Sequence, residues 1–327
     1  MSKTYRWGFL SASGIANTVA EDFKHAGLVI HAVGARDLER AQVFAAKHDI
    51  PVVYGSYEEL VADTDIDIVY VSTVQTMHFQ HALLALNAGK HVLLEKPFTI
   101  NADQAEHLKA AALRNNVMIL EAMWTRFLPA HRALAADLEA GVIGKPMMVT
   151  ADHSQYLPQE RVARLWSPEL GGGALLDLGI YPVSFANFVF GAPGSISAQS
   201  TLTADNLDII TSGLFGYEDG SQAAFTTTMA QAGPVTASIL GTEGRIEIDT
   251  PFYCNVAYSV YDSDNNLVKR VDESTAGRGM QHQAVHLEEC LRAGLLDSPI
   301  LPIDESISIM QTMDAIRAIG GIKYPGE

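Results

Sequence analysis

The first 120 residues alternate between short, continuous apolar runs and amphipathic stretches. Continuous runs rich in Val, Ile and Leu are typical of buried strands, and apolar residues three and four positions apart are typical of helices. The runs that predict strands cover residues 5–10, 28–35, 67–73, 91–94 and 117–120. Strands that alternate with helices are joined by right-handed crossovers, so this part of the chain is predicted to form a doubly wound parallel sheet.

Several helix ends are marked by residues that suit the unpaired backbone groups there. Asp37 is predicted to cap the helix after the second strand, and Ser56 with Glu59 forms a capping-box pattern. A further helix is expected to begin near Asn101. Pro129 suits the first position of a helix, because no N–H donor is needed there.

From Pro146 onward the pattern changes to strand-like runs separated by turn residues. These runs cover residues 146–155, 195–203, 208–217, 221–230, 235–241, 244–250 and 256–271. Turn signals such as Glu218-Asp219-Gly220 and Asn265-Asn266 favour short connections, which predicts a large, mostly antiparallel open sheet. Two late helices are predicted at about 280–293 and 304–320.

These patterns predict a two-domain α/β protein. At 327 residues the chain is long enough to bury two separate cores. We expect a doubly wound domain over residues 1–123 and a second α/β domain over residues 124–327. The helix at 304–320 is expected to pack back on the first domain.

Charge and cysteine content narrow the class of protein. The formal net charge is −16 and the pI about 5, which argues against nucleic acid and anionic membranes as partners. The two cysteines lack metal-ligand spacing, and no third ligand accompanies His282 and His286, so no metal site is predicted. No apolar run of membrane-spanning length and no cleavable signal precede the first strand, so we expect a cytoplasmic protein.

The turn after the first strand reads Ser11-Ala12-Ser13-Gly14-Ile15-Ala16. In a doubly wound sheet, a dinucleotide pyrophosphate lies at this place, over small residues and a helix N-terminus. Ser11 and Ser13 occupy the first two glycine positions of the usual G-x-G-x-x-G/A pattern. Serine is still small and can donate to a phosphate oxygen, so a dinucleotide site is favoured over a purely structural turn.

The end of the second strand indicates which dinucleotide is bound. A site for NAD usually places Asp or Glu there, to bind the ribose hydroxyls. This chain has Ala35-Arg36, with Arg40 one helical turn later. A guanidinium suits a 2′-phosphate, so NADP(H) is predicted over NAD(H); the alternative is a pair of surface arginines.

Glu95-Lys96-Pro97 ends the strand that begins at His91. Proline cannot donate a ladder hydrogen bond, so the carboxylate and the amine are expected at the carboxyl edge of the sheet. Ligands of open α/β sheets bind at that edge. The alternative is an ordinary ion pair at the end of a strand.

A second candidate group follows Gly171-Gly172-Gly173. Asp177 and Tyr181 are four residues apart, so on an α-helix both side chains point the same way. Gly179 between them is costly in a helix unless another group packs closely against it, and the three glycines likewise predict a close backbone approach. The alternative is a capped core helix whose polar side chains bond to neighbouring loops.

With these pieces assembled, the chain resembles the glucose–fructose oxidoreductase/inositol dehydrogenase (Gfo/Idh/MocA) family nearly end to end. The resemblance lies in Trp7 to Ala16, Thr73 to His78, Glu95-Lys96-Pro97, Gly171-Gly172-Gly173 with Asp177 and Tyr181, and the 304–320 helix. Glu121 to Phe127 and Gly172 to Tyr181 look like the dihydrodiol dehydrogenase branch. The resemblance implies an N-terminal Rossmann domain and a C-terminal α/β domain whose open sheet pairs subunits, hence a homodimer or higher homo-oligomer.

The resemblance also implies roles for individual residues. Lys96 is expected to be the catalytic lysine, Tyr181 the acid/base and Asp177 the active-site carboxylate. Contacts on the cofactor side are expected from Thr73, Val74, His78, Glu95, Lys96, Glu121 and Trp166. Val74-Gln75 stands where the family commonly has Pro-Asn.

The reaction expected from this resemblance is reversible hydride transfer between NADP(H), or alternatively NAD(H), and a carbinol or carbonyl carbon. The substrate would be a sugar, a polyol or a cyclic diol. Hydride chemistry belongs to the cofactor, so Lys96 and Tyr181 would handle the proton. The rival hypothesis is a non-catalytic NAD(P)-binding sensor or regulatory protein of the same fold, and a tetrapyrrole reductase is a third. The presence of Lys96, Asp177 and Tyr181 together favours the dehydrogenase.

Overall fold

The computed structural model describes residues 3–254 and 257–324. The chain divides into two compact units. The first unit comprises the chain up to Leu128 together with Ala276–Ile307, and the second comprises Pro129–Thr275 and the chain from Ser308 onward. The helix predicted at 304–320 runs Ile303–Gly320 (α9), so it begins in the first unit and continues in the second.

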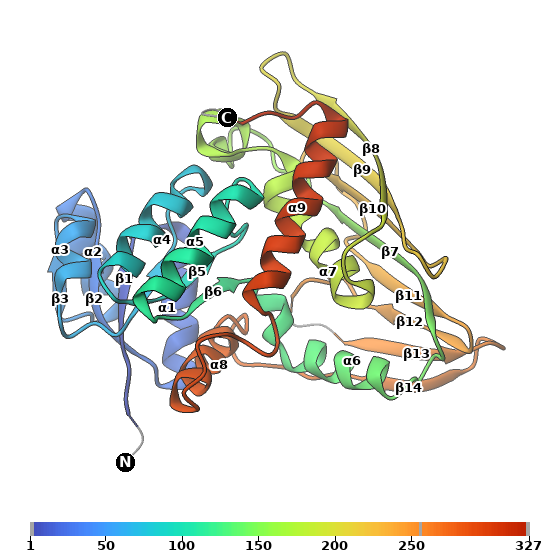
Figure 1. The fold of residues 1–327 in the computed structure, drawn as a ribbon, viewed down its shortest axis with the longest axis horizontal. Helices are drawn as coiled ribbons and strands as arrows, with labels where there is room; N and C mark the ends of the chain where they lie inside the picture. The colour runs from blue at the N-terminus through green and yellow to red at the C-terminus, as the bar shows by residue number, and fades with distance from the viewer. Residues whose placement is uncertain (1–2, 255–256, 325–327) are drawn as a thin grey trace. The chain divides into compact units, whose positions relative to one another are not determined.

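The first unit contains a six-stranded, all-parallel sheet in the order β3-β2-β1-β4-β5-β6. Its strands are β1 (Arg6–Leu10), β2 (Val29–Gly34), β3 (Val52–Tyr54), β4 (Ile68–Val71), β5 (His91–Glu95) and β6 (Ile119–Ala122). Its helices are α1 (Gly14–Ala26), α2 (Leu38–His48), α3 (Tyr57–Ala62), α4 (His78–Asn87), α5 (Ala102–Asn115) and α8 (Gln281–Arg292). This order confirms the doubly wound parallel sheet, and Figure 1 shows α4 and α5 side by side over it.

Local hydrogen bonds account for the helix starts in this unit. The predicted caps are confirmed: the Asp37 side chain accepts from the Arg40 N–H, and the Ser56 side chain accepts from the Glu59 N–H. Each cap satisfies a donor that the first helical turn leaves unpaired.

One strand lies two residues later than predicted. The run 117–120 was expected, but β6 covers Ile119–Ala122. Asn116 adopts a left-handed conformation that ends α5, and the Val117 N–H still donates to Ala112 O at the end of that helix. The strand therefore begins only after this cap is complete.

The second unit contains an eight-stranded sheet in the order β14-β13-β12-β11-β7-β10-β9-β8. Its strands are β7 (Pro146–Ser154), β8 (Ser195–Leu202), β9 (Asp208–Gly216), β10 (Gln222–Thr228), β11 (Ala237–Gly241), β12 (Gly244–Ile248), β13 (Tyr258–Asp262) and β14 (Leu267–Val271). All neighbouring pairs are antiparallel except β7 with β10, which confirms the mostly antiparallel sheet.

The predicted run 256–271 divides into β13 and β14, which form a hairpin. Residue 256 lies outside the described residues. Asp262 accepts from the backbone N–H groups of Asp264 and Asn266, and Asn265 has a φ of 67°, so the turn follows from its Asn and Asp content.

Helices α6 (Pro129–Glu139) and α7 (Ile180–Phe190) belong to the second unit, and α7 packs on β7 and β10 (Figure 1). The Tyr258 hydroxyl on β13 donates to Asp137 Oδ2 on α6 at 2.6 Å. The chain from Pro168 to Phe190 is apolar and long enough to span a bilayer, but 83% of its most apolar window is buried inside the fold. This burial is typical of a core helix.

Candidate active site

The turn between β1 and α1 keeps the backbone geometry that glycine usually supplies. Ser11 has a φ of 113°, a conformation that L-residues rarely adopt. Ser13 caps α1, because its Oγ accepts from the Ala16 N–H at 3.2 Å. A Cβ built on exposed Gly14 would meet no atom within 4 Å, so the helix N-terminus is open to an incoming group. The residues present therefore fit a dinucleotide pyrophosphate.

This turn lies where the strand order reverses, because β1 pairs with β2 on one side and with β4 on the other. Ser13 Oγ donates to Ser72 Oγ at 3.2 Å, which ties the turn to the end of β4. Arg40 Nε donates to Ala12 O at 3.1 Å, so Arg40 holds the turn from α2. Ile15 is half-buried, and Arg36 is exposed at the end of β2.

A buried histidine joins the ends of β4 and β5. His78 Nδ1 lies 2.8 Å from Pro97 O, and its Nε2 lies 3.2 Å from Thr73 O. Burial lowers the pKa of His78 to about 4, so the ring is neutral at physiological pH. Thr73 Oγ1 also contacts His81 Nδ1 at 3.0 Å, and Val74 is half-buried in an extended conformation at the next position.

Glu95 and Lys96 lie at the carboxyl end of β5, as predicted. Glu95 is buried, and its Oε1 accepts from the Tyr70 hydroxyl at 2.6 Å. Its Oε2 accepts from the Lys96 backbone N–H at 3.2 Å. The Lys96 side chain is half-buried, and the Lys96–Pro97 peptide bond is cis. The carboxylate thus holds the backbone that presents the amine.

Glu121 lies at the carboxyl end of β6 and is fully enclosed in the first unit. Its Oε1 accepts from the Phe98 N–H at 3.1 Å, and its Oε2 accepts from the Ser306 hydroxyl at 2.7 Å. Burial raises the pKa of Glu121 to about 7; these two hydrogen bonds oppose the rise, and nearby Glu305 adds to it. The carboxyl group therefore changes charge near neutral pH.

Replacing Glu121 by Gln should remove part of the pH dependence of stability. The folded state of the wild type holds this proton up to about pH 7, whereas the unfolded chain releases it near its ordinary pKa, so stability falls as the pH rises between the two. Between pH ~5.5 and ~8.5 the free energy of unfolding of the wild type should fall by about 2 kcal/mol more than that of the variant. Urea unfolding of both proteins across this range measures the difference. A wild-type-minus-variant difference that is constant with pH would contradict the assignment.

The segment that carries Asp177 is not the regular α-helix that was predicted. Leu175–Gly179 forms a π-helical turn, and the α-helix α7 begins only at Ile180. The wider turn means that Asp177 and Tyr181 do not stand in the one-turn relation of an α-helix. The predicted close packing at Gly179 is confirmed, since a Cβ there would lie 3.0 Å from Leu175 Cδ1 and 3.1 Å from Thr227 Cγ2.

The predicted close approach at the triple glycine is also confirmed. A Cβ on Gly172 would lie 2.4 Å from Leu165 O, and one on Gly173 would lie 2.1 Å from Asp208 Oδ1. Gly173 also has a φ of 109°, so a side chain is excluded there by both space and backbone conformation.

Asp177 is paired with an arginine that the sequence did not single out. Arg164 Nη2 lies 3.0 Å from Asp177 Oδ1, and the carboxylate side chain is 10% exposed. Two residues further on, the Trp166 ring donates from Nε1 to Leu157 O at 2.8 Å and lines a hollow of about 650 Å³. One short loop therefore supplies both the Asp177 partner and Trp166.

Tyr181 is buried among other rings. His153 packs edge-on against it, with centroids 5.1 Å apart, and Tyr253 lies at 4.7 Å. Sequence reasoning missed His153, Tyr253 and Asp208. The available signals were a histidine at an inward position of β7 and an aspartate inside the apolar stretch that begins β9.

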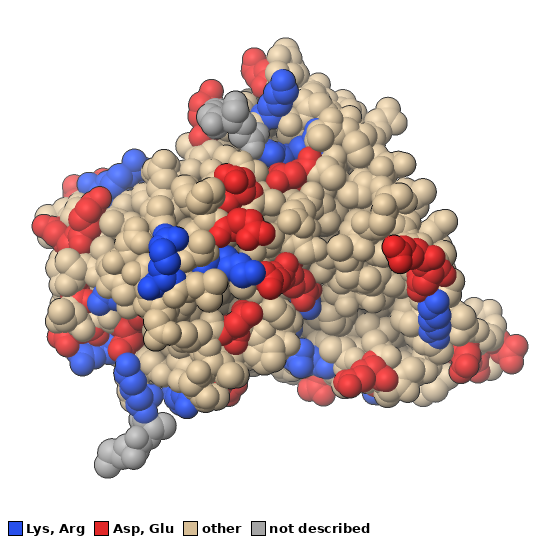
Figure 2. Space-filling view, viewed as in Figure 1, with Lys and Arg blue, Asp and Glu red and all other residues tan. Residues whose placement is uncertain are grey.

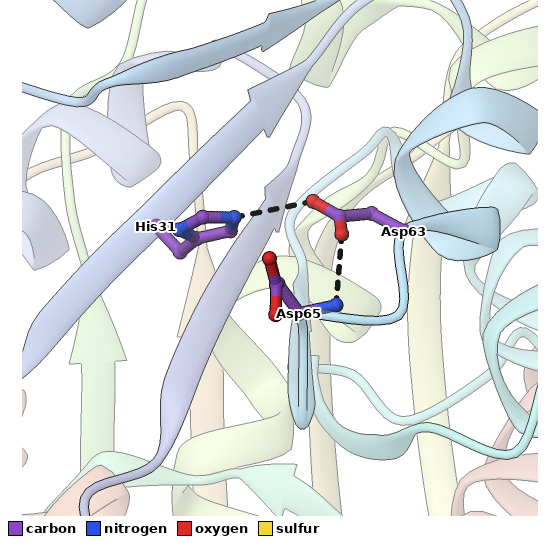
Figure 3. A group of neighbouring side chains, drawn as sticks. All are labelled: His31, Asp63 and Asp65. Atoms are coloured by element: carbon purple, nitrogen blue, oxygen red, sulfur yellow. Dashed lines mark hydrogen bonds and ion pairs between the residues drawn. The ribbon is translucent and has the colours of Figure 1, made fainter.

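Figure 3 shows another polar group of the first unit, His31 with Asp63 and Asp65. Asp63 Oδ2 lies 3.2 Å from His31 Nε2 and accepts from the Tyr54 hydroxyl, and Asp63 Oδ1 accepts from the Asp65 N–H at 2.8 Å. Asp65 Oδ1 lies 2.8 Å from Arg6 Nη1. These carboxylate oxygens already accept from donors of the protein. The group is therefore a set of ion pairs and hydrogen bonds that joins β2 to the loop after α3. Figure 2 shows basic and acidic side chains interspersed over the visible surface.

The strand order and the open turn at the point of reversal define a dinucleotide-binding domain, with Glu95 and Lys96 at the carboxyl edge of its sheet. Two family models match the chain: an oxidoreductase family with an NAD-binding Rossmann fold over residues 6–123, and the GFO/IDH/MocA C-terminal domain over residues 131–247. The chain therefore belongs to the Gfo/Idh/MocA family and is an NAD(P)-dependent dehydrogenase or reductase that acts on CH–OH groups.

Full-length relatives and solved structures agree with this assignment. The chain is 36% identical to a trans-1,2-dihydrobenzene-1,2-diol dehydrogenase of Xenopus tropicalis, over 98% of this chain and 99% of the relative. It is 37% identical to the mouse protein of the same name, over 98% of each. A 3-ketoreductase from Actinomadura kijaniata, solved with NADP and TDP-benzene, superposes with a TM-score of 0.85 at 25% identity, over 97% of this chain and 98% of that one. An aldose–aldose oxidoreductase from Caulobacter crescentus has the same fold, with a TM-score of 0.87 at 22% identity and 98% coverage of both chains.

Proposed function

We propose that this protein is an NADP(H)-preferring dehydrogenase that oxidises a secondary alcohol of a cyclic diol, a sugar or a polyol, and reduces the corresponding ketone. The observation that carries the proposal is the end-to-end similarity to trans-1,2-dihydrobenzene-1,2-diol dehydrogenases, in a chain that has Lys96, Asp177 and Tyr181. An aldose–aldose oxidoreductase among the structural relatives is the reason for including sugars in the proposed substrate class.

The first unit supplies the residues proposed to hold the cofactor. Ser11, Ala12, Ser13, Gly14 and Ile15 would lie under the pyrophosphate, where the α1 N-terminus offers N–H groups to an anion. Arg36 would bind the 2′-phosphate, and Arg40 would hold the turn through Ala12 O. The residues of this unit proposed to line the nicotinamide side are Thr73, Val74, His78, Glu95 and Lys96, and Trp166 of the second unit is added to them. Glu121, whose side chain is enclosed, would support this side by accepting from the Phe98 N–H. When bound, the nicotinamide supplies the hydride acceptor or donor.

The remaining task of the protein is to move one proton. A tyrosine near its reference pKa of ~10 is a poor base at neutral pH. We propose that the Lys96 ammonium stabilises the Tyr181 phenolate and so brings it into the working range. In the reductive direction the same pair would donate a proton to the carbonyl oxygen. Asp177, held by Arg164, would orient Lys96 or accept a hydrogen bond from a substrate hydroxyl.

We further propose a cytoplasmic homodimer formed through the outer face of the second sheet. Leu214, Ala224 and Thr150 are register partners on that face, and Ser238 continues the row. None of these side chains is buried, and Leu214 is 46% exposed. An uncharged, solvent-facing row that crosses four neighbouring strands suits a second copy of the same sheet.

Cofactor titration and a substrate screen test the proposed function. NADPH should bind at least about tenfold more tightly than NADH by fluorescence, and Arg36→Ala should remove most of that preference. Absorbance change should appear with trans-dihydrodiols, or with sugars or polyols, under NADP⁺. Equal affinity for both cofactors would refute the NADP preference. Binding of NADPH without turnover of any of these substrates would favour the sensor hypothesis.

A further inference from the structure

The π-helical turn Leu175–Gly179 is held by three adjacent strands of the second sheet. In the order β7-β10-β9, each strand directs one buried polar side chain at this turn or its flanks: His153, Thr227 and Asp208. His153 and Thr227 are register partners in neighbouring strands. A π turn is an uncommon conformation, and it persists where its surroundings determine it. These three side chains are therefore candidates for what determines it.

Asp208 holds the start of the turn. Its side chain is fully buried, and its Oδ2 accepts from the Leu175 N–H at 2.6 Å. Its Oδ1 has no hydrogen-bond partner among the described residues and lies against Gly173, whose missing side chain leaves room for it. Burial raises the pKa of Asp208 to about 7, and hydrogen bonds from backbone N–H groups oppose that rise. Burial of this carboxyl group is unfavourable, and its contacts with backbone N–H groups at the start of the turn offset part of that cost.

His153 holds the end of the turn. Its Nδ1 lies 3.0 Å from Leu178 O, and its Nε2 lies 2.9 Å from Gln155 Nε2. Because the amide nitrogen of Gln155 can only donate, Nε2 is the acceptor and Nδ1 carries the proton that goes to Leu178 O. The same ring packs edge-on against Tyr181 at 5.1 Å. One histidine therefore contacts both the turn and the proposed acid/base.

Thr227 supports the middle of the arrangement. Its hydroxyl donates to His153 O at 3.0 Å, and its methyl group fills the space beside Gly179. The turn is thus held at its first N–H, at its fourth carbonyl and at its last residue. These positions lie on either side of Asp177, and the last of them is two residues before Tyr181.

We propose that Asp208 and His153 are positioning residues of this enzyme: by holding the two ends of the π turn, they set where the Asp177 carboxylate and the Tyr181 hydroxyl lie. The inference rests on the proposed role of Tyr181. Neither residue is assigned a contact with substrate or cofactor. Their effect should therefore appear in turnover, and not in the binding of cofactor by the first unit.

Matched pairs of variants separate the effect of losing a hydrogen bond from the effect of changing the shape of the side chain. Asp208→Asn keeps an acceptor for the Leu175 N–H, and His153→Asn keeps a donor for Leu178 O. Asp208→Leu and His153→Leu remove these groups. The Leu variants should lower kcat about tenfold or more, with KM and the NADPH Kd within about threefold. The Asn variants should recover most of kcat.

Thr211→Val is the control, because Thr211 is buried on the same sheet face but its hydroxyl bonds to Ser200. It should keep wild-type turnover.

A double-variant cycle tests whether Asp208 and His153 affect turnover through Tyr181. In a Tyr181→Phe background, Asp208→Leu and His153→Leu should lower kcat by less than about threefold, because the hydroxyl they position is already gone. Fully additive losses, or Leu and Asn variants of equal activity, would overturn the inference. If Asp208→Leu does not fold, the His153 pair decides the result alone. Wild-type turnover in Tyr181→Phe itself would instead refute the proposed function.

Discussion

Replacing Lys96 by Met should lower turnover by about 10³-fold or more and leave the NADPH affinity within about threefold of wild type. Met keeps the length and bulk of the lysine stem at the end of β5, but it carries no charge and no transferable proton. The backbone that presents residue 96 should persist, because Glu95 accepts from the backbone N–H and not from the replaced group in that contact. Steady-state turnover and NADPH fluorescence titration on the same sample measure the two effects.

Lys47→Met is the matched control for this change. Lys47 lies in α2 of the same unit, is exposed, and forms an ion pair with Glu21 at 3.1 Å. The control should retain wild-type kcat, because an exposed ion pair contributes little. Wild-type-like turnover in Lys96→Met would reject Lys96 as a catalytic residue. Loss of NADPH binding in that variant would instead show that Lys96 serves mainly to bind the cofactor.

Replacing Tyr181 by Phe should lower kcat on the order of 10²-fold or more, if the phenol is the general acid/base. Phe keeps the ring that packs against His153 and Tyr253, so the fold of the second unit should be unchanged. Tyr217→Phe makes the same chemical change at a buried hydroxyl for which the described residues offer no hydrogen-bond partner, and it should leave kcat unaltered. Equal kcat for Tyr181→Phe and wild type would remove Tyr181 from the mechanism.

Lys96→Met and Tyr181→Phe together also test whether the amine and the phenol cooperate in the same proton transfer. If Lys96 works by stabilising the Tyr181 phenolate, the double variant should be little slower than the slower single variant. Independent functions would instead multiply the two losses. The pH profile of kcat/KM gives a second measure. When the ammonium is lost, the acidic limb should move toward higher pH in alcohol oxidation, where the phenolate is the base, and the basic limb should move toward higher pH in ketone reduction, where the phenol is the acid.

Much of the first unit could be predicted because its information is local. Alternating apolar runs and helical periodicities predicted the parallel sheet, and single side chains such as Asp37 and Ser56 marked helix starts through hydrogen bonds three residues away. Glycines also carried a readable signal. Close packing was predicted at Gly173 and Gly179, because a glycine in a costly position implies that something else occupies the space of its side chain.

The residue that occupies the space beside such a glycine could not be predicted from the sequence. Asp208 Oδ1 fills the position beside Gly173, Arg164 pairs with Asp177, and His153 contacts both Leu178 O and Tyr181. Asp208 and His153 come from strands whose register is set by pairing across the second sheet.

The sequence by itself determined which elements form, where helices begin and which reactive side chains lie at the ends of strands, because periodicity and capping act over a few residues. Only the tertiary structure decided that the segment with Asp177 is a π turn, and which buried groups hold it. That choice depends on contacts between residues that the sheet brings together from distant parts of the chain.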